Sequence, residues 1–286
     1  MPIETAILFV LQRLMFWMRA QRPEPLRDAN SGPDAQLAGE WERRLWDDGY
    51  VAVPGFKSAA WCAQARQELL SLLDDPVVVT RHAEDLRVFG IETLCPTARE
   101  FAADPLLARL ACTYARSREG LLFCMANKVS YQEGVPHGSG GEWHRDSFKR
   151  ELKAMLYLTD VEQPDGPLSI VRGSHRGIGI VADAGRLVGR RGRLPAVSAT
   201  RLQDAGDYFR KRCPNRVVDL TGESGMLLLF DASAIHTGLP PRSNGKPRLA
   251  LTNYYSTQSE LESFRAYYRP LVKLNGYPDG PASPNG

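Results

Sequence analysis

The feature that most constrains the fold of this 286-residue chain is a series of short apolar segments in its second half, each bounded by Gly, Pro, Asp or Asn. Short segments with turn residues between them are typical of the strands of an all-β sandwich or barrel. The segments that we predict to be strands are 121–131, 153–158, 168–171, 216–220, 225–230 and 248–255.

The first part of the chain has a helical pattern instead. Apolar residues recur at helical spacing over 35–47 and 59–73, and a third helix is predicted over 104–115. A short strand-like run, 49–54, lies between the first two helices. We therefore expect a mainly β fold in which a helical N-terminal layer packs against a jelly roll.

The predicted domain boundaries follow from this change of pattern. Residues 34–286 are expected to form one domain, preceded by an apolar helix and a linker over 1–33. Within the domain we predict helical support over 34–118, the jelly-roll core over 119–258 and a C-terminal extension over 259–286. The core contains an insertion at 183–214, which is read as a loop with a helix over 199–211.

Composition excludes several classes of protein. The chain is 43% hydrophobic and 24% charged, which is ordinary for a globular protein, and its formal net charge of +3 argues against nucleic-acid binding. The five cysteines are far apart and include no CxxC pair, so neither a disulfide framework nor a structural zinc site is expected. A reducing cytoplasm is the predicted compartment.

The N-terminus leaves two interpretations open. Residues 7–18 are apolar except for Gln12 and Arg13, and the run is shorter than the roughly 20 residues that span a bilayer. It is predicted to be a helix docked on the protein's own body, or an in-plane helix that gives residues 4–19 a peripheral contact with a membrane. Residues 21–33 are rich in Pro, Arg and Asp, which is typical of a linker.

Three residues form a candidate metal site. His144 and Asp146 are two positions apart, so on a strand both side chains would project from the same face. His236 follows the apolar strand predicted over 225–230. If the two segments face each other, the three side chains would bind one face of a metal ion and leave three positions open. This is the arrangement of non-haem Fe(II) oxygenases.

An arginine downstream completes the pattern. Arg248 lies twelve residues after His236 and opens an apolar strand. A planar guanidinium can grip a carboxylate with two hydrogen bonds, which suits the distal carboxylate of 2-oxoglutarate. Arg242 is a rival for this role, but it lies in the turn-like segment 240–245, so we prefer Arg248.

These passages resemble the phytanoyl-CoA dioxygenase family of 2-oxoglutarate oxygenases. The resemblance implies a double-stranded β-helix (cupin-like) core, Fe(II), 2-oxoglutarate as co-substrate with O2, and release of succinate and CO2. It gives His144, Asp146 and His236 the role of iron ligands and Arg248 the role of 2-oxoglutarate clamp. The matching pieces are 143–146, 156–160, 165–176, 225–230, His236 and Arg248.

The same resemblance bears on the type of reaction. Halogenases of the family have a small residue where this chain has Asp146, so hydroxylation, or a related desaturation or ring closure, is favoured here. We expect catalysis by His144, Asp146 and His236 on a small-molecule, lipid or glycan substrate. Two alternatives stay open: a non-catalytic module that binds 2-oxoglutarate and metal, and a cupin-type metal enzyme that does not use 2-oxoglutarate.

Several neighbouring side chains have two interpretations each. Tyr131 and Tyr157 could contact 2-oxoglutarate or be core aromatic residues, and His137 could contact substrate or face solvent. His175 lies in a Gly-Ser-His-Arg turn and is expected to bond backbone rather than metal. The basic residues beside the metal motif could attract an anionic substrate or form a solvated rim, and they are Arg145, Lys149 and Arg150.

Overall fold

The computed structural model describes residues 33–82, 85–115, 121–135, 142–146, 150–176 and 205–255. Several predictions lie outside these residues: the apolar segment 4–19 and its linker, most of the insertion, the C-terminal extension, His137 and Lys149. No helix in the described part of the chain is long and apolar enough to cross a membrane.

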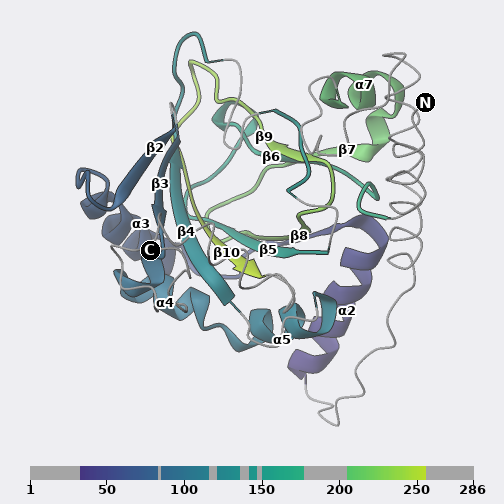
Figure 1. Cartoon of the computed structure of the whole chain (residues 1–286), viewed down its shortest axis with the longest axis horizontal. Coiled ribbons are helices and arrows are strands. Elements are labelled where there is room, and N and C mark those ends of the chain that lie inside the picture. The colour runs from purple at the N-terminus through teal and green to yellow at the C-terminus, as the bar shows by residue number, and fades with distance from the viewer. Residues whose placement is uncertain are drawn as a thin grey trace, which may run out of the picture.

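Two antiparallel sheets form the centre of the protein (Figure 1). The seven-stranded sheet has the order β1-β8-β5-β10-β4-β3-β2, and the three-stranded sheet has the order β7-β6-β9. The strands of the large sheet are β1 (Tyr50–Val53), β8 (Leu227–Asp231), β5 (Leu152–Tyr157), β10 (Arg248–Tyr255), β4 (Leu121–Val129), β3 (Asp85–Phe89) and β2 (Val79–His82). Those of the small sheet are β7 (Val217–Leu220), β6 (Leu168–Val171) and β9 (His236–Gly238). This pairing of strands distant in sequence confirms the expected jelly roll.

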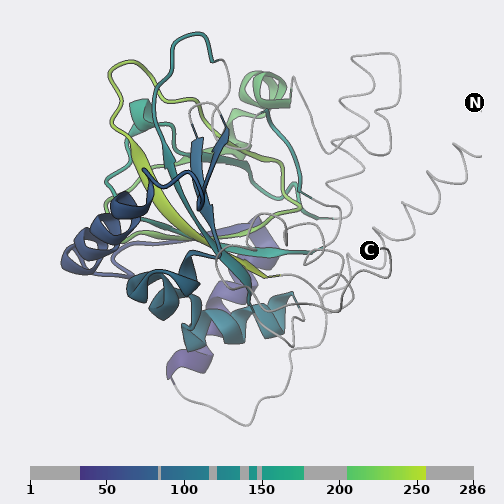
Figure 2. The same cartoon turned by 60° about the vertical axis from the view of Figure 1, so that its left-hand side comes forward.

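The helices lie together on one side of the large sheet, opposite the small sheet (Figures 1 and 2). They are α2 (Pro33–Asp48), α3 (Ala59–Leu72), α4 (Pro96–Ala102) and α5 (Pro105–Tyr114), with the short η1 (Ile91–Thr93). Polar side chains define two of the helix starts, because Ser58 accepts a hydrogen bond from the Trp61 backbone and Asp104 accepts one from Leu106. Next to the small sheet are α7 (Ala205–Arg212), η2 (Gln163–Asp165) and η3 (Pro214–Arg216).

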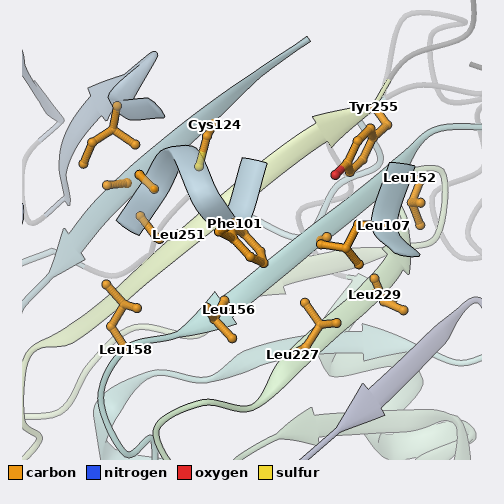
Figure 3. Close-up of a cluster of buried hydrophobic side chains, with 14 of the residues drawn as sticks. Phe101, Leu107, Cys124, Leu152, Leu156, Leu158, Leu227, Leu229, Leu251 and Tyr255 are labelled. Atoms are coloured by element: carbon orange, nitrogen blue, oxygen red, sulfur yellow. The ribbon is translucent and has the colours of Figure 1, made fainter. Parts of the chain in front are cut away.

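The two faces of the large sheet have different contents, because successive side chains of a strand point to opposite faces. On β5, Leu152, Ala154 and Leu156 belong to the core that the helices cover. Figure 3 shows part of this core, with Phe101 of α4 and Leu107 of α5 beside leucines of β5 and β8. Burial of each such leucine or phenylalanine stabilises the fold by about 1.5–3 kcal/mol.

The inner face of the large sheet is turned toward the small sheet. Tyr157 of β5 and Phe230 of β8 pack there with Leu168 and Ile170 of β6 in a second apolar cluster. The alternation places Lys153 and Met155 on this same inner face of β5. The space between the sheets is therefore lined by side chains that the helical core does not use.

Two strands in the first part of the chain are not predicted from the sequence. β2 and β3 extend the large sheet at the edge beyond β4, so the N-terminal part contributes strands as well as helices. Their sequence carries charged residues such as Asp85 and Arg87, which form an ion pair at 2.5 Å. Asn127 of β4 also donates a hydrogen bond to Asp85, at 3.2 Å, so polar side chains connect the two strands.

Candidate active site

Backbone pairing brings the two histidines of the predicted triad together. His236 begins β9, and His144 forms an isolated antiparallel bridge with it through two backbone hydrogen bonds of 2.9 Å. The two imidazole rings lie 4.5 Å apart, centre to centre. Asp146 is held on the same segment as His144, because its backbone N–H donates to the Ala232 carbonyl at 2.9 Å.

The carboxylate of Asp146 lies between the two imidazoles. Its Oδ1 is 3.5 Å from His144 Nε2 and its Oδ2 is 3.5 Å from His236 Nε2. One ligand atom from each of the three residues lies within 4.8 Å of the other two. Two nitrogens and one carboxylate oxygen on one side of a shared point form the donor set of a non-haem iron centre.

Hydrogen bonds fix which nitrogen of each histidine is available to a metal. His144 Nδ1 contacts the Glu142 carbonyl oxygen at 2.6 Å, and His236 Nδ1 contacts the Ala234 carbonyl oxygen at 2.9 Å. Because a carbonyl oxygen can only accept, each Nδ1 carries a hydrogen, and in the neutral imidazole each Nε2 then keeps its lone pair. Both lone pairs belong to the nitrogens that face Asp146.

The protonation states suit a divalent cation. Burial raises the pKa of the Asp146 carboxyl, but positive charge beside it, above all the Lys153 ammonium, holds this pKa well below its usual range. Burial and the neighbouring His144 lower the pKa of His236, despite the opposing effect of Asp146. An ionised carboxylate and a neutral imidazole are the forms that bind metal.

A buried arginine connects the segments that carry the triad. The Arg145 guanidinium donates to the carbonyl oxygens of Ser174, at 2.7 Å, and of Ser233. Arg145 was expected beside an anionic substrate or on a solvated rim, and this expectation is wrong, because the side chain is 4% exposed and bonds backbone. Because both hydrogen bonds go to backbone carbonyl groups, Arg145 joins the segment of the metal ligands to those of Ser174 and Ser233.

The turn before His236 is shaped by a second set of buried contacts. Asp231 accepts hydrogen bonds from the Ser233 backbone at 2.8 Å and from its hydroxyl at 2.6 Å. The Tyr114 hydroxyl of α5 donates to the same carboxylate at 2.7 Å. Ser174 Oγ accepts from the Ile235 backbone at 2.7 Å. Helix, loop and turn together therefore set the position of His236.

We expect the Ser174→Ala variant to lose about 1–3 kcal/mol of the free energy of unfolding, because the buried Ile235 N–H is left without its acceptor. Urea denaturation measures this loss. Ser71→Ala is the matched control: its exposed hydroxyl donates only within α3, at 2.7 Å, and the change should stay within about 0.5 kcal/mol. Equal effects of the two substitutions would contradict the prediction.

Arg248 is buried between the sheets at the start of β10, with 1% of its surface exposed. It donates a hydrogen bond to the Gly166 carbonyl oxygen, while its Nε has no partner. In the part of the chain that the structure describes, no carboxylate pairs with this guanidinium. A buried cation without a counter-ion is costly, so the site fits an anionic ligand such as a carboxylate of 2-oxoglutarate. The rival Arg242 is exposed in a turn.

The two candidate tyrosines are placed differently. The Tyr157 hydroxyl donates to the Leu220 carbonyl oxygen at 2.9 Å and accepts from the Leu168 backbone at 3.0 Å. Burial raises the pKa of Tyr157, which keeps this hydroxyl protonated as a bridge between the sheets. Tyr131 follows β4 and is 46% exposed. A contact of either side chain with 2-oxoglutarate stays a prediction.

The structure also places His175 and Lys153. His175 Nε2 lies 3.0 Å from the Trp46 carbonyl oxygen, which is the backbone contact expected for it. Lys153 was not singled out in the sequence, yet its Nζ lies 2.5 Å from Asp146 Oδ2. The only signal for it is a lysine within the otherwise apolar run 152–158.

The fold and the triad define the class: a jelly-roll protein with a two-histidine, one-carboxylate metal centre. The family model described as Phytanoyl-CoA dioxygenase (PhyH) matches residues 45–250. The chain therefore belongs to the phytanoyl-CoA dioxygenase family. As a member of this family it is a non-haem iron dioxygenase that uses 2-oxoglutarate, which confirms the cofactors expected from the sequence.

Similar proteins agree with this assignment. Ectoine dioxygenase of Stutzerimonas stutzeri is 26% identical over 76% of this chain and 76% of its own length. Ectoine dioxygenase of Halomonas elongata is 24% identical over 94% of this chain and 85% of its own length. Among solved structures, EctD from S. alaskensis with bound Fe has a TM-score of 0.58 and 20% identity, with 83% of both chains covered. The epimerase SnoN from nogalamycin biosynthesis has a TM-score of 0.55 and 22% identity, covering 78% of this chain and 83% of its own.

Proposed function

We propose that the chain hydroxylates a small organic molecule, with iron held by His144, Asp146 and His236 and 2-oxoglutarate held by Arg248. The observation that carries the proposal is the convergence of one ligand atom from each triad residue within 4.8 Å. The buried guanidinium of Arg248, on the inner face of the large sheet, supports the use of a 2-oxo acid with a second carboxylate.

Each residue has a physical task in this proposal. The three triad residues would hold the metal on one face and would leave its other positions to the co-substrates. Arg248 orients the distal carboxylate of 2-oxoglutarate through paired hydrogen bonds. Phe230 lies edge-on to His236 at 5.2 Å between ring centres and helps to exclude water. Iron, when bound, supplies the O2 chemistry that couples decarboxylation of the 2-oxo acid to oxidation of a C–H bond.

The substrate is a small molecule in this proposal, and its identity is a question for screening. The relatives named ectoine dioxygenase make ectoine the first compound to test. Substrate-dependent formation of succinate from 2-oxoglutarate is the measurement, because it does not require the product to be known. Lipid-linked, glycan-linked and anionic compounds follow in the same screen.

The test of the cofactor site is an anaerobic titration of the apoprotein with Fe(II) and 2-oxoglutarate, followed by visible absorption. We expect a weak charge-transfer band with the wild-type protein and no band with His144→Ala, because the variant lacks one of three metal ligands. His175→Gln is the matched control and should keep the band, since His175 bonds the Trp46 backbone. Metal binding without a band would favour a cupin-type enzyme that does not use 2-oxoglutarate. A band without succinate formation with any compound would favour the non-catalytic module.

A further inference from the structure

We propose that Lys153 is a positioning residue that holds one oxygen of Asp146, so that Asp146 binds iron through its other oxygen alone. The inference rests on the proposed iron site and adds to it the residue that keeps a coordination position open. Lys153 lies nine residues after His144 and belongs to a different element, β5.

The contact is direct and specific. Lys153 Nζ lies 2.5 Å from Asp146 Oδ2, within the range of a strong charge-assisted hydrogen bond. Apart from the two histidines of the triad, Lys153 is the one side chain in the described ranges that forms a hydrogen bond or ion pair with the Asp146 carboxylate. The position of this carboxylate is therefore set by its two fellow ligands and one ammonium group.

The lysine is itself held firmly. It lies opposite Phe230 of β8 and Tyr254 of β10 in the large sheet and is 9% exposed. Its Nζ rests 4.4 Å from the centre of the Tyr254 ring, which stacks on Phe123 at 4.6 Å and 23°. A cation over an aromatic face is favourable, and more so when both are shielded from water. The strand and the stacked rings together fix where the ammonium can lie.

The hydrogen bond between Lys153 and Asp146 matters because the metal has a limited number of coordination positions. A carboxylate can bind iron through one oxygen or through both. Three protein atoms leave three positions, of which 2-oxoglutarate takes two and O2 needs the last. If both oxygens of Asp146 bound the metal, the position for O2 would be filled. If Oδ2 also bound iron, it would share its electron density between the metal and the Lys153 ammonium, which weakens both contacts, so the hydrogen bond with Lys153 favours binding through Oδ1 alone.

The experiment uses nitric oxide as a stand-in for O2. Wild-type protein is loaded anaerobically with Fe(II) and 2-oxoglutarate, titrated with nitric oxide and followed by electron paramagnetic resonance of the iron–nitrosyl complex. The Lys153→Met variant removes the positive charge but keeps a side chain of similar length. We expect it to reach half-saturation at a nitric oxide concentration about tenfold higher than the wild-type protein. This change corresponds to the loss of one charge-assisted hydrogen bond. Lys153→Arg restores a donor cation and should stay within about threefold of wild type.

The Fe(II)–2-oxoglutarate absorption band is recorded in the same samples. The proposal is supported if Lys153→Met keeps this band but binds nitric oxide weakly, and if Lys153→Arg recovers nitric oxide binding. Equal nitric oxide affinity in all three proteins would overturn it. Loss of the band and of nitric oxide binding together would also overturn it, because Lys153 would then only support the fold. A wild-type protein without the band would show instead that the proposed function is wrong.

Discussion

Replacing Arg248 with methionine is expected to raise the 2-oxoglutarate concentration for half-maximal turnover by about a hundredfold or more. The guanidinium is buried, has one backbone partner and no carboxylate partner in the described part of the chain, so a bound carboxylate would be its counter-ion. The paired, charge-assisted hydrogen bonds between the guanidinium and this carboxylate are worth about 3 kcal/mol, and losing them corresponds to about a hundredfold change in concentration. Steady-state kinetics with varied 2-oxoglutarate, measured as succinate release, give the result.

The matched control for this prediction is Arg242→Met. Arg242 is exposed in the turn before β10, and the sequence alone leaves it as a rival for the same role. We expect its replacement to change the 2-oxoglutarate requirement by less than about twofold, as for a surface charge screened by solvent. A large effect of Arg242→Met together with a small effect of Arg248→Met would reverse the assignment.

Gly166→Ala is expected to lower the free energy of unfolding by about 3 kcal/mol or more. Gly166 has a φ of +74°, which costs a residue with a side chain about 1–2 kcal/mol. A Cβ atom there would also overlap the carbonyl oxygen of Leu239 and press on Pro241. The closest atoms are backbone atoms of the segment after β9, which cannot move aside as the end of a flexible side chain could. Denaturant unfolding measures the loss.

The Gly173→Ala variant distinguishes the cost of the backbone conformation from the cost of the steric overlap. Gly173 has nearly the same conformation, with a φ of +71°, but a Cβ atom there would meet nothing within 4 Å. Gly173→Ala should therefore show the conformational cost alone, about 1–2 kcal/mol. If Gly166→Ala lowers the free energy of unfolding no more than Gly173→Ala does, the contact of the added Cβ atom with the Leu239 backbone contributes little to the loss.

Much of the jelly roll can be predicted from the sequence, because its strands are apolar and end at turn residues. The segments 168–171 and 248–255 coincide with β6 and β10, and 121–131 contains β4. β2 and β3 are different, since their sequence is rich in charge and contains no apolar run. What stabilises β3 is a partner strand and the side chain of Asn127, and a local pattern does not contain such partners.

The candidate site is predictable to a similar extent. The order of His144, Asp146, His236 and Arg248 along the chain is enough to suggest the metal and 2-oxoglutarate site, because each residue follows or opens a recognisable segment. The contact of Lys153 with Asp146 depends on strand register, so it becomes visible only in three dimensions. Arg145 adjoins two metal ligands in the sequence, yet its side chain bonds the backbone of Ser174 and Ser233, so its nearness in sequence was a poor guide to its role.

The two faces of the large sheet carry different sets of side chains, so the inner face can change in sequence separately from the core beneath the helices. Thr252 of β10 lies between Met125 of β4 and Met155 of β5, and all three point away from the leucine-rich core beneath the helices. Methionine adapts readily to differently shaped neighbours, and Thr252 Oγ1 has no hydrogen-bond partner. A combinatorial library at these three positions would therefore vary the inner face of the sheet, which also carries Lys153 and Arg248, while the core beneath the helices stays unchanged.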